Sequence, residues 1–346
     1  MKYLHFSILS FLILCTLSCK SNKQNGPTQL DVKPGIISFV DSAAASTAII
    51  NEDIDGYFDQ LSVAEMQIQM KKNLPNQKKE DVKKAYLTFL KKQVSDWTTD
   101  EKLKMQQLFK SVKRLCDTLS PRIFPGGMKL IKVKTNHFGN DVYYTSGKNI
   151  MIPENIFNDF SPERQLPVMI HETFHILSRY NSSLRNELYS YIGFQKAEKP
   201  IQLNASLEAV LLNNPDGVSY QYAIDLEKDG SMIKAIPLIT SKSLNYDTKR
   251  PNFFDYLQFD LYSLDDKGSH YVAKSTTTGE TLLPLQSTPN FFTKIKDNTQ
   301  YIIHPDEIMA DNFMLALLAY DKNEYGKFSK DGKILIQKIL DKLKTL

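Results

Sequence analysis

Pro167-Val-Met-Ile-His-Glu-Thr-Phe-His-Ile-Leu-Ser-Arg179 is the stretch around which this chain is organised. It is strongly apolar and contains the pattern His171-Glu172-Thr-Phe-His175. Residues four apart on a helix lie one above the other, so both imidazoles can reach a single metal ion. We expect a buried helix from Pro167 to about Arg179, because a bound metal supplies the partner that buried histidines need.

The residue types in this pattern favour zinc. Zinc binds imidazole nitrogen at about 2.0–2.1 Å and lowers the pKa of water toward about 7. The Glu172 side chain points in an adjacent direction, where a carboxylate can take a proton from water and pass it to a leaving amine. The pattern predicts one zinc ion per chain, with His171 and His175 as ligands and Glu172 as general base and acid.

A catalytic zinc needs a third protein ligand and an open fourth position. The metzincin pattern places glycine and histidine at fixed steps after the second histidine, but Ser178 and Asn181 occupy those steps here. That class is therefore excluded. The remaining candidates are acidic: Glu187, Glu198 and Glu307.

Glu307 has a second carboxylate near it in the expected fold. Glu307 and Asp311 are four residues apart in a predicted helix that begins at Pro305. Asp311 could thus accept a hydrogen bond from the other ring nitrogen of a ligand histidine. However, acidic residues that follow a helix-starting proline, here Asp306 and Glu307, also complement the helix dipole. Spacing alone therefore favours Glu307 only modestly.

Length and composition exclude several classes of protein. The chain has 346 residues, of which 42% are hydrophobic and 24% are charged, and this is ordinary for globular proteins. A disordered, collagen-like or polytopic membrane protein is excluded. The 43 Lys+Arg and 39 Asp+Glu give a net charge of +4, with no sign of the concentrated basic face that nucleic acid requires.

The N-terminus is typical of an exported lipoprotein. An apolar run from Phe6 to Leu17 follows Met1-Lys2 and is too short to span a bilayer. It ends in Thr16-Leu-Ser-Cys19, which resembles a lipobox. We predict a signal peptide at 1–18, lipidation of Cys19, a tether at 19–35 and anchoring at the cell envelope, in the outer membrane. The alternative is an ordinary cleaved signal peptide.

The pattern along the rest of the chain predicts an α+β fold. Helical spacing and capping boxes at Ser62 and Thr98 indicate a helical subdomain over 36–122, with Cys116 in its core. Residues 123–346 would form the metal-binding domain. It would contain a small sheet from 128–133, 141–145 and 149–152, then the His171 helix, a β-rich insertion at about 215–303, and closing helices.

The chain resembles bacterial gluzincin-type zinc metallopeptidases. The resemblance covers about 125–315 and is strongest in the His171-Glu-Thr-Phe-His175 pattern and in His304-Pro-Asp-Glu-Ile-Met-Ala-Asp-Asn-Phe313. It implies that Glu307, in a Glu-x-x-x-Asp helix, is the third zinc ligand. The sequence departs from the better-known families because 132 residues (307 − 175) separate His175 from Glu307.

The expected function is zinc-dependent peptide-bond hydrolysis on a peptide or protein substrate. The alternatives are a non-catalytic surface-binding lipoprotein that keeps the zinc-peptidase-like fold, and a zinc hydrolase of a non-peptide amide. The strand before the metal-binding helix, around 142–145, could pair with an extended substrate. Donors to a developing oxyanion could come from Tyr222, His270, Tyr301 or His304.

Overall fold

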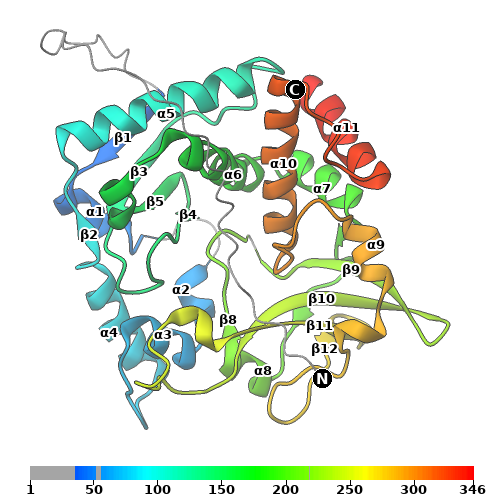
Figure 1. Ribbon diagram of the computed structural model, residues 1–346. Coiled ribbons are helices and arrows are strands. Elements are labelled where there is room, and N and C mark those ends of the chain that lie inside the picture. Colours follow the sequence, from blue (N-terminus) through cyan, green and yellow to red (C-terminus); the bar gives the residue numbers. More distant parts are fainter. Residues whose placement is uncertain (1–35, 52–55, 218) are drawn as a thin grey trace, which may run out of the picture. The chain divides into compact units, whose positions relative to one another are not determined.

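The computed structural model describes residues 36–51, 56–217 and 219–346 (Figure 1). The fold is α+β, as predicted, with two sheets and several helices. The predictions for residues 1–35, namely the signal peptide, the lipidated Cys19 and the tether, lie outside the described residues. Among the described residues, no helix is both long enough and apolar enough to cross a membrane.

The first sheet contains the strands that precede the His171 helix. Its order is β1-β3-β5-β4, with β4 antiparallel at the edge, and a short strand β2 also pairs with β3. Leu130 and Ile131 of β3 are both fully buried, although they point to opposite faces. Both faces of this sheet are therefore covered. The strands are β1 (Ile37–Val40), β2 (Val94–Ser95), β3 (Met128–Val133), β4 (Tyr144–Ser146) and β5 (Asn149–Pro153).

The elements before residue 122 pack against the elements that follow. Strand β1 pairs in parallel with β3, and residues of α5 join one hydrophobic core with residues of α6. The predicted boundary at 122 is thus no break in the packing, and the segment 36–122 is not purely helical. Its helices are α1 (Ser42–Ala48), α2 (Tyr57–Gln60), α3 (Val63–Met70), α4 (Lys79–Leu90) and α5 (Thr99–Asp117).

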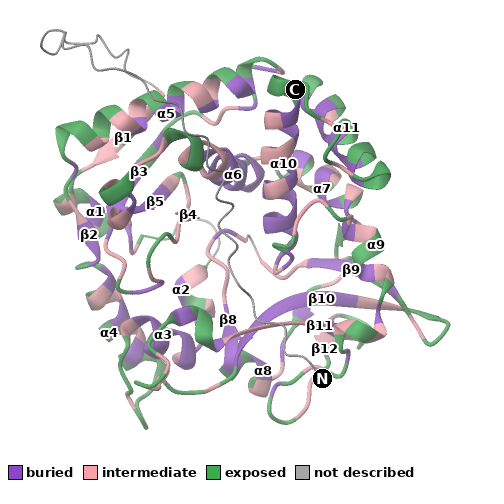
Figure 2. Cartoon of the chain, in the orientation of Figure 1, coloured by how far each residue is buried: buried purple, intermediate pink, exposed green. Residues whose placement is uncertain are grey.

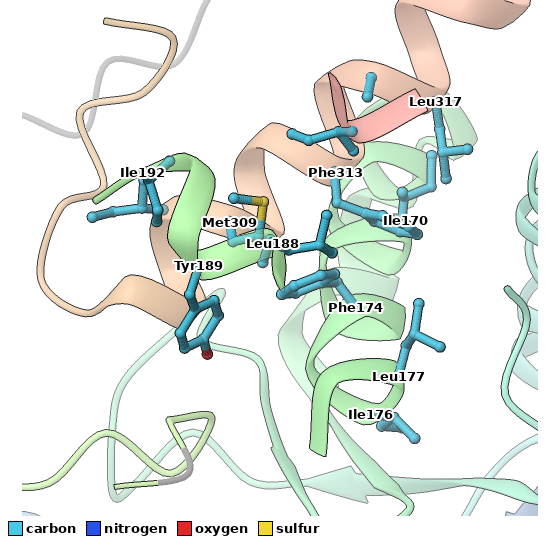
Figure 3. Packing of buried hydrophobic residues seen from close by; sticks show 14 of the residues in the cluster. Ile170, Phe174, Ile176, Leu177, Leu188, Tyr189, Ile192, Met309, Phe313 and Leu317 are labelled. Atoms are coloured by element: carbon cyan, nitrogen blue, oxygen red, sulfur yellow. The ribbon is translucent and has the colours of Figure 1, made fainter. Parts of the chain in front are cut away.

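Helices α6 (Pro162–Tyr180), α7 (Ser182–Tyr191) and α10 (Pro305–Lys322) contribute residues to the candidate site, and α11 (Lys330–Lys344) packs against α10 and α7. Helix α6 begins five residues before the predicted start, because Ser161 caps it and Pro162 stands at its first position, where proline needs no N–H partner. Phe174 of α6 meets Phe313 of α10 with ring centroids 5.3 Å apart (Figure 3). In Figure 2, α6 is buried from Met169 to Arg179, while its first turn is exposed.

The second sheet begins before the predicted insertion. Its order is β6-β9-β10-β11-β12-β7, and β8 pairs with β10. Strands β6 to β8 precede residue 215, so the β-rich region extends back to Phe194. The strands are β6 (Phe194–Lys196), β7 (Ile201–Gln202), β8 (Leu211–Leu212), β9 (Tyr222–Lys228), β10 (Ser231–Ser241), β11 (Leu257–Asp266) and β12 (Tyr271–Ala273). Helix α8 (Ala205–Val210) lies between β7 and β8 in sequence, and α9 (Asn290–Ile295) follows β12.

The burial of Cys116 leads to a test of the fold. Cys116 has no exposed surface, and burial raises the pKa of its thiol to about 12. A buried, protonated thiol is a poor nucleophile. In the full chain with Cys15→Ser and Cys19→Ser, we expect no reaction with a disulfide reagent at pH 8 under native conditions, and one thiol per chain in denaturant. Rapid labelling of the native protein would contradict this packing.

Candidate metal centre

Two histidines of α6 face one carboxylate of α10. His171 and His175 stand one helical turn apart, with ring centroids 4.7 Å from each other. Glu307 Oε2 lies 3.0 Å from His171 Nε2 and 3.6 Å from His175 Nε2. Two atoms that each bind one tetrahedral zinc ion at about 2.0–2.1 Å are about 3.3–3.5 Å apart. The observed separations are close to this spacing, so the three side chains fit a common ion.

Two buried atoms at this place make no hydrogen bond with the part of the chain that the structure describes. Among the described residues, Glu172 Oε2 and His175 Nε2 are buried and make no hydrogen bond. Buried polar atoms are almost always hydrogen-bonded, so such atoms call for a ligand or an ion. His175 Nε2 is the atom that a metal would bind. The missing hydrogen bonds of His175 Nε2 and Glu172 Oε2 therefore support an ion between His171, His175 and Glu307.

Carboxylates of α10 hold the other ring nitrogen of each histidine. His171 Nδ1 lies 2.8 Å from Asp311 Oδ1, and His175 Nδ1 lies 2.7 Å from Asp306 Oδ2. A carboxylate can only accept these hydrogen bonds, so each one keeps the proton on Nδ1 and leaves Nε2 for a metal. The predicted contact of Asp311 with a ligand histidine is present, whereas the role of Asp306 was missed.

Asp306 is itself fixed by other buried groups. Ser178 Oγ donates to Asp306 Oδ1 at 2.9 Å, and the Tyr189 hydroxyl donates to the same oxygen. His304 caps α10, because its Nδ1 accepts from the Asp306 backbone N–H at 3.1 Å. The sequence offered a signal for Asp306, since it lies beside Glu307 after Pro305, but helix-dipole complementarity accounted equally well for an acid there.

A loop from the second sheet reaches the same centre. Asn214 Nδ2 donates to Glu307 Oε1 at 2.6 Å. The side chains of Asp216, His175 and Glu307 offer ligand atoms that all lie within 4.8 Å of one another. Neither Asn214 nor Asp216 was predicted, because no spacing rule connects them with the α6 histidines. The only signal was the turn-forming Asn214-Pro-Asp216 sequence itself.

This loop is also tied to the N-terminal helices. Glu65 of α3 is fully buried, and its Oε2 accepts from the backbone N–H of Asn213 at 2.9 Å and from its side-chain amide at 3.0 Å. Burial raises the pKa of Glu65 to about 7. Asn213 thus joins α3 to Asn214, which in turn holds Glu307.

Burial and charge set the protonation of the acids in the centre. Burial and then the nearby Asp216 carboxylate raise the pKa of Glu172 to about 8. Burial also acts to raise the pKa of Glu307, but the His175 and His171 imidazoles overcome it and hold that pKa at about 2. Glu307 is therefore a permanent anion suited to a cation, while Glu172 can exchange a proton near neutral pH.

The other acidic candidates lie elsewhere. Glu187 Oε2 lies 2.6 Å from Lys342 Nζ, in an exposed ion pair. Glu198 accepts a hydrogen bond from the Tyr271 hydroxyl at 3.1 Å at the surface of the second sheet. Neither is in contact with the histidines, so of the three acids that spacing left open, the structure brings only Glu307 to them.

The four candidate oxyanion donors differ in their distance from the two histidines. The Tyr222 hydroxyl bonds Asn186 and Arg185, while His304 caps α10 and His270 contacts Ser269. The Tyr301 ring instead stacks on that of His171 at 6.1 Å and is 43% exposed. Tyr301 is thus the candidate that lies against the centre and also faces solvent.

No protein-family model, curated protein or solved structure matches this chain. The resemblance to gluzincins therefore stays a prediction from the residues quoted in the sequence analysis.

The geometry predicts which acid binds a divalent cation. Glu307→Ala should weaken zinc binding more than 100-fold, beyond the about 10–100-fold typical of residues that orient a ligand. Asp306→Asn should fall within that range, because it replaces one of the oxygens that accept from His175, Ser178 and Tyr189 and leaves the proposed metal ligands in place. Competition with a coloured chelator measures both affinities.

Glu187→Ala is the matched control, since this glutamate pairs with Lys342 away from the centre. It should bind zinc like the unmodified chain. Loss of zinc in Glu187→Ala with full retention in Glu307→Ala would contradict the assignment.

Proposed function

We propose that this chain is a zinc-dependent metallopeptidase, a hydrolase that cleaves peptide bonds. The observation that carries the proposal is the Glu172 carboxylate, which is buried beside the two histidines with Oε2 unpartnered. A protein that only binds a partner or a glycan has no use for a carboxylate at this position. A hydrolase needs one there, to move protons between water and the leaving group.

His171, His175 and Glu307 would hold one zinc ion per chain. A bound zinc ion supplies Lewis acidity, which activates water and polarises the substrate carbonyl. Asp311 and Asp306 keep the two imidazoles in the tautomer that leaves Nε2 for the metal. Asn214 fixes the orientation of the Glu307 carboxylate through its Oε1.

Glu172 would perform the proton transfers. It accepts a proton from the attacking water as the oxygen bonds to the carbonyl carbon, and it then donates that proton to the leaving nitrogen as the C–N bond breaks. Burial and the Asp216 carboxylate raise its pKa to about 8, so this glutamate binds a proton more readily than an exposed one. Tyr301, exposed and stacked on His171, is placed to meet the substrate.

The test of the peptidase proposal separates the metal from the proton transfer. Glu172→Gln keeps the size of the side chain and removes its ability to accept a proton. Zinc content should be retained, while peptide cleavage should fall by the about 10²–10⁴-fold typical of general acid–base catalysis. Zinc stoichiometry and cleavage of a mixed peptide library, measured on the same samples, give both values.

Glu187→Gln serves as the control, because it makes the same chemical change at an exposed ion pair. It should cleave like the unmodified chain. Undiminished cleavage by Glu172→Gln would assign hydrolysis to another site, and a binding function would replace the proposal. Cleavage of small amides but not of peptides would instead indicate a non-peptide amide hydrolase.

We also propose that the protein acts at the cell envelope, anchored by a lipid on Cys19. The support is the apolar run that ends at this cysteine. Cys19→Ser should abolish labelling by a fatty-acid probe and release the protein from the membrane fraction, whereas Cys116→Ser should be labelled normally. Unchanged labelling of Cys19→Ser would exclude the anchor.

A further inference from the structure

We propose that Asp216 is a fourth protein ligand, so that the resting metal centre is closed and Asp216 must withdraw before a substrate can bind. This inference rests on the metal site of the proposed function. In zinc proteins, four protein ligands are typical of closed sites, while a catalytic site has three and keeps the fourth position open. The position of Asp216 decides between these two arrangements.

Asp216 lies where a fourth ligand would have to be. A carboxylate oxygen of Asp216, a ring nitrogen of His175 and a carboxylate oxygen of Glu307 all fall within 4.8 Å of one another. The three side chains are buried, with 7%, 1% and 1% exposure. His175 Nε2 and Glu172 Oε2 have no hydrogen-bond partner among the described residues, and the Asp216 carboxylate interacts electrostatically with both side chains.

Charge balance supports the same assignment. Glu307 and Asp216 bring two carboxylates close together inside the protein, where like charges cost much free energy. A divalent cation bound by two anionic and two neutral ligands gives a centre without net charge. Counted over the ligands alone, the same ion with His171, His175 and Glu307 would keep one positive charge.

The Asp216 carboxylate is held in place by the first sheet. Its Oδ1 accepts from the Thr145 hydroxyl at 2.7 Å and from the Thr145 backbone N–H. Thr145 belongs to β4, the edge strand. Asp216 therefore also occupies a backbone donor at this edge.

Arg179 fixes the backbone on either side of this contact. One guanidinium nitrogen donates to the carbonyls of Pro215 and Asp216 at 2.9 and 3.2 Å, and the other donates to Thr145 Oγ1 at 2.9 Å. A Cβ on Gly217 would lie 2.7–2.9 Å from the His304 ring. The missing side chain at Gly217 therefore lets this segment pack against the start of α10.

These contacts are hydrogen bonds to a short polar segment, whereas α6 and α10 are joined by an apolar core as well as by hydrogen bonds. A substrate that offers its own carbonyl oxygen and backbone groups can replace hydrogen bonds and one carboxylate ligand. Withdrawal of Asp216 would free the fourth position and the Thr145 N–H at the same time.

The test uses the full chain with Cys15→Ser and Cys19→Ser, so that no N-terminal thiol takes up metal. Cobalt replaces zinc as an optical probe, and azide probes for an open position. The unmodified centre should give a visible spectrum that azide does not change. Asp216→Asn keeps an acceptor for Thr145 but is a poor ligand, so its spectrum should differ and should respond to azide.

Two further measurements accompany the spectra. Asp216→Asn should lower zinc affinity by at least 10-fold, and at saturating zinc its peptide cleavage should rise about 10-fold, because the position is open without a withdrawal step. Asp216→Ala should behave alike. Asp225→Ala, at an exposed ion pair with Lys234, is the control and should change neither the spectrum nor the rate.

The outcomes distinguish this inference from the proposed function. Equal zinc affinity and equal cobalt spectra for Asp216→Asn and the unmodified chain would overturn the fourth-ligand assignment and leave the peptidase proposal intact. If Asp216→Asn cleaved peptides more slowly at saturating zinc, the proposal that Asp216 closes the centre would be overturned, because Asp216 would then contribute to the reaction. If the unmodified chain binds neither zinc nor cobalt, the metal site itself fails.

Discussion

The pairing of two imidazoles on α6 with carboxylates on the first two turns of α10 is the constraint on which the rest of the structure depends. Buried ionisable groups are tolerated only when each has a partner. His171 and His175 therefore require that α10 lie at a fixed distance from α6 and be rotated so that its carboxylates face the two imidazoles. The apolar contact between Phe174 and Phe313 also holds α6 against α10.

The chain satisfies this constraint across a large separation in sequence. The second sheet and its connections lie between α6 and α10, and they return the chain so that His304 and Pro305 start α10 beside the centre. The same connections supply Asn214 and Asp216. The inserted region is thus part of the centre as well as a spacer between its two helices.

Sequence reasoning found those parts of the centre that follow from helical periodicity. His171, Glu172 and His175 are related by one turn of a helix, and so are Glu307 and Asp311, so each set could be placed without the fold. Asp216 could not be found in this way, because its position depends on how a loop crosses the edge of β4. The role of Asp306 was ambiguous, because an aspartate at the start of a helix can complement the helix dipole or accept a hydrogen bond from a histidine. The packing across residue 122 could not be predicted for a similar reason: periodicity indicates helices, but it does not show that β1 pairs with β3.

The hydrogen bonds from Asn213 to Glu65 have a consequence for how this protein could change over evolution. A segment that only carried the centre away from the membrane could be lost, exchanged or lengthened freely. Here α3 contributes a buried acid to the loop that supports Glu307, and β1 contributes a strand to the sheet. The N-terminal third and the remainder should therefore be inherited as one module, and recombination between them should yield chains that do not fold.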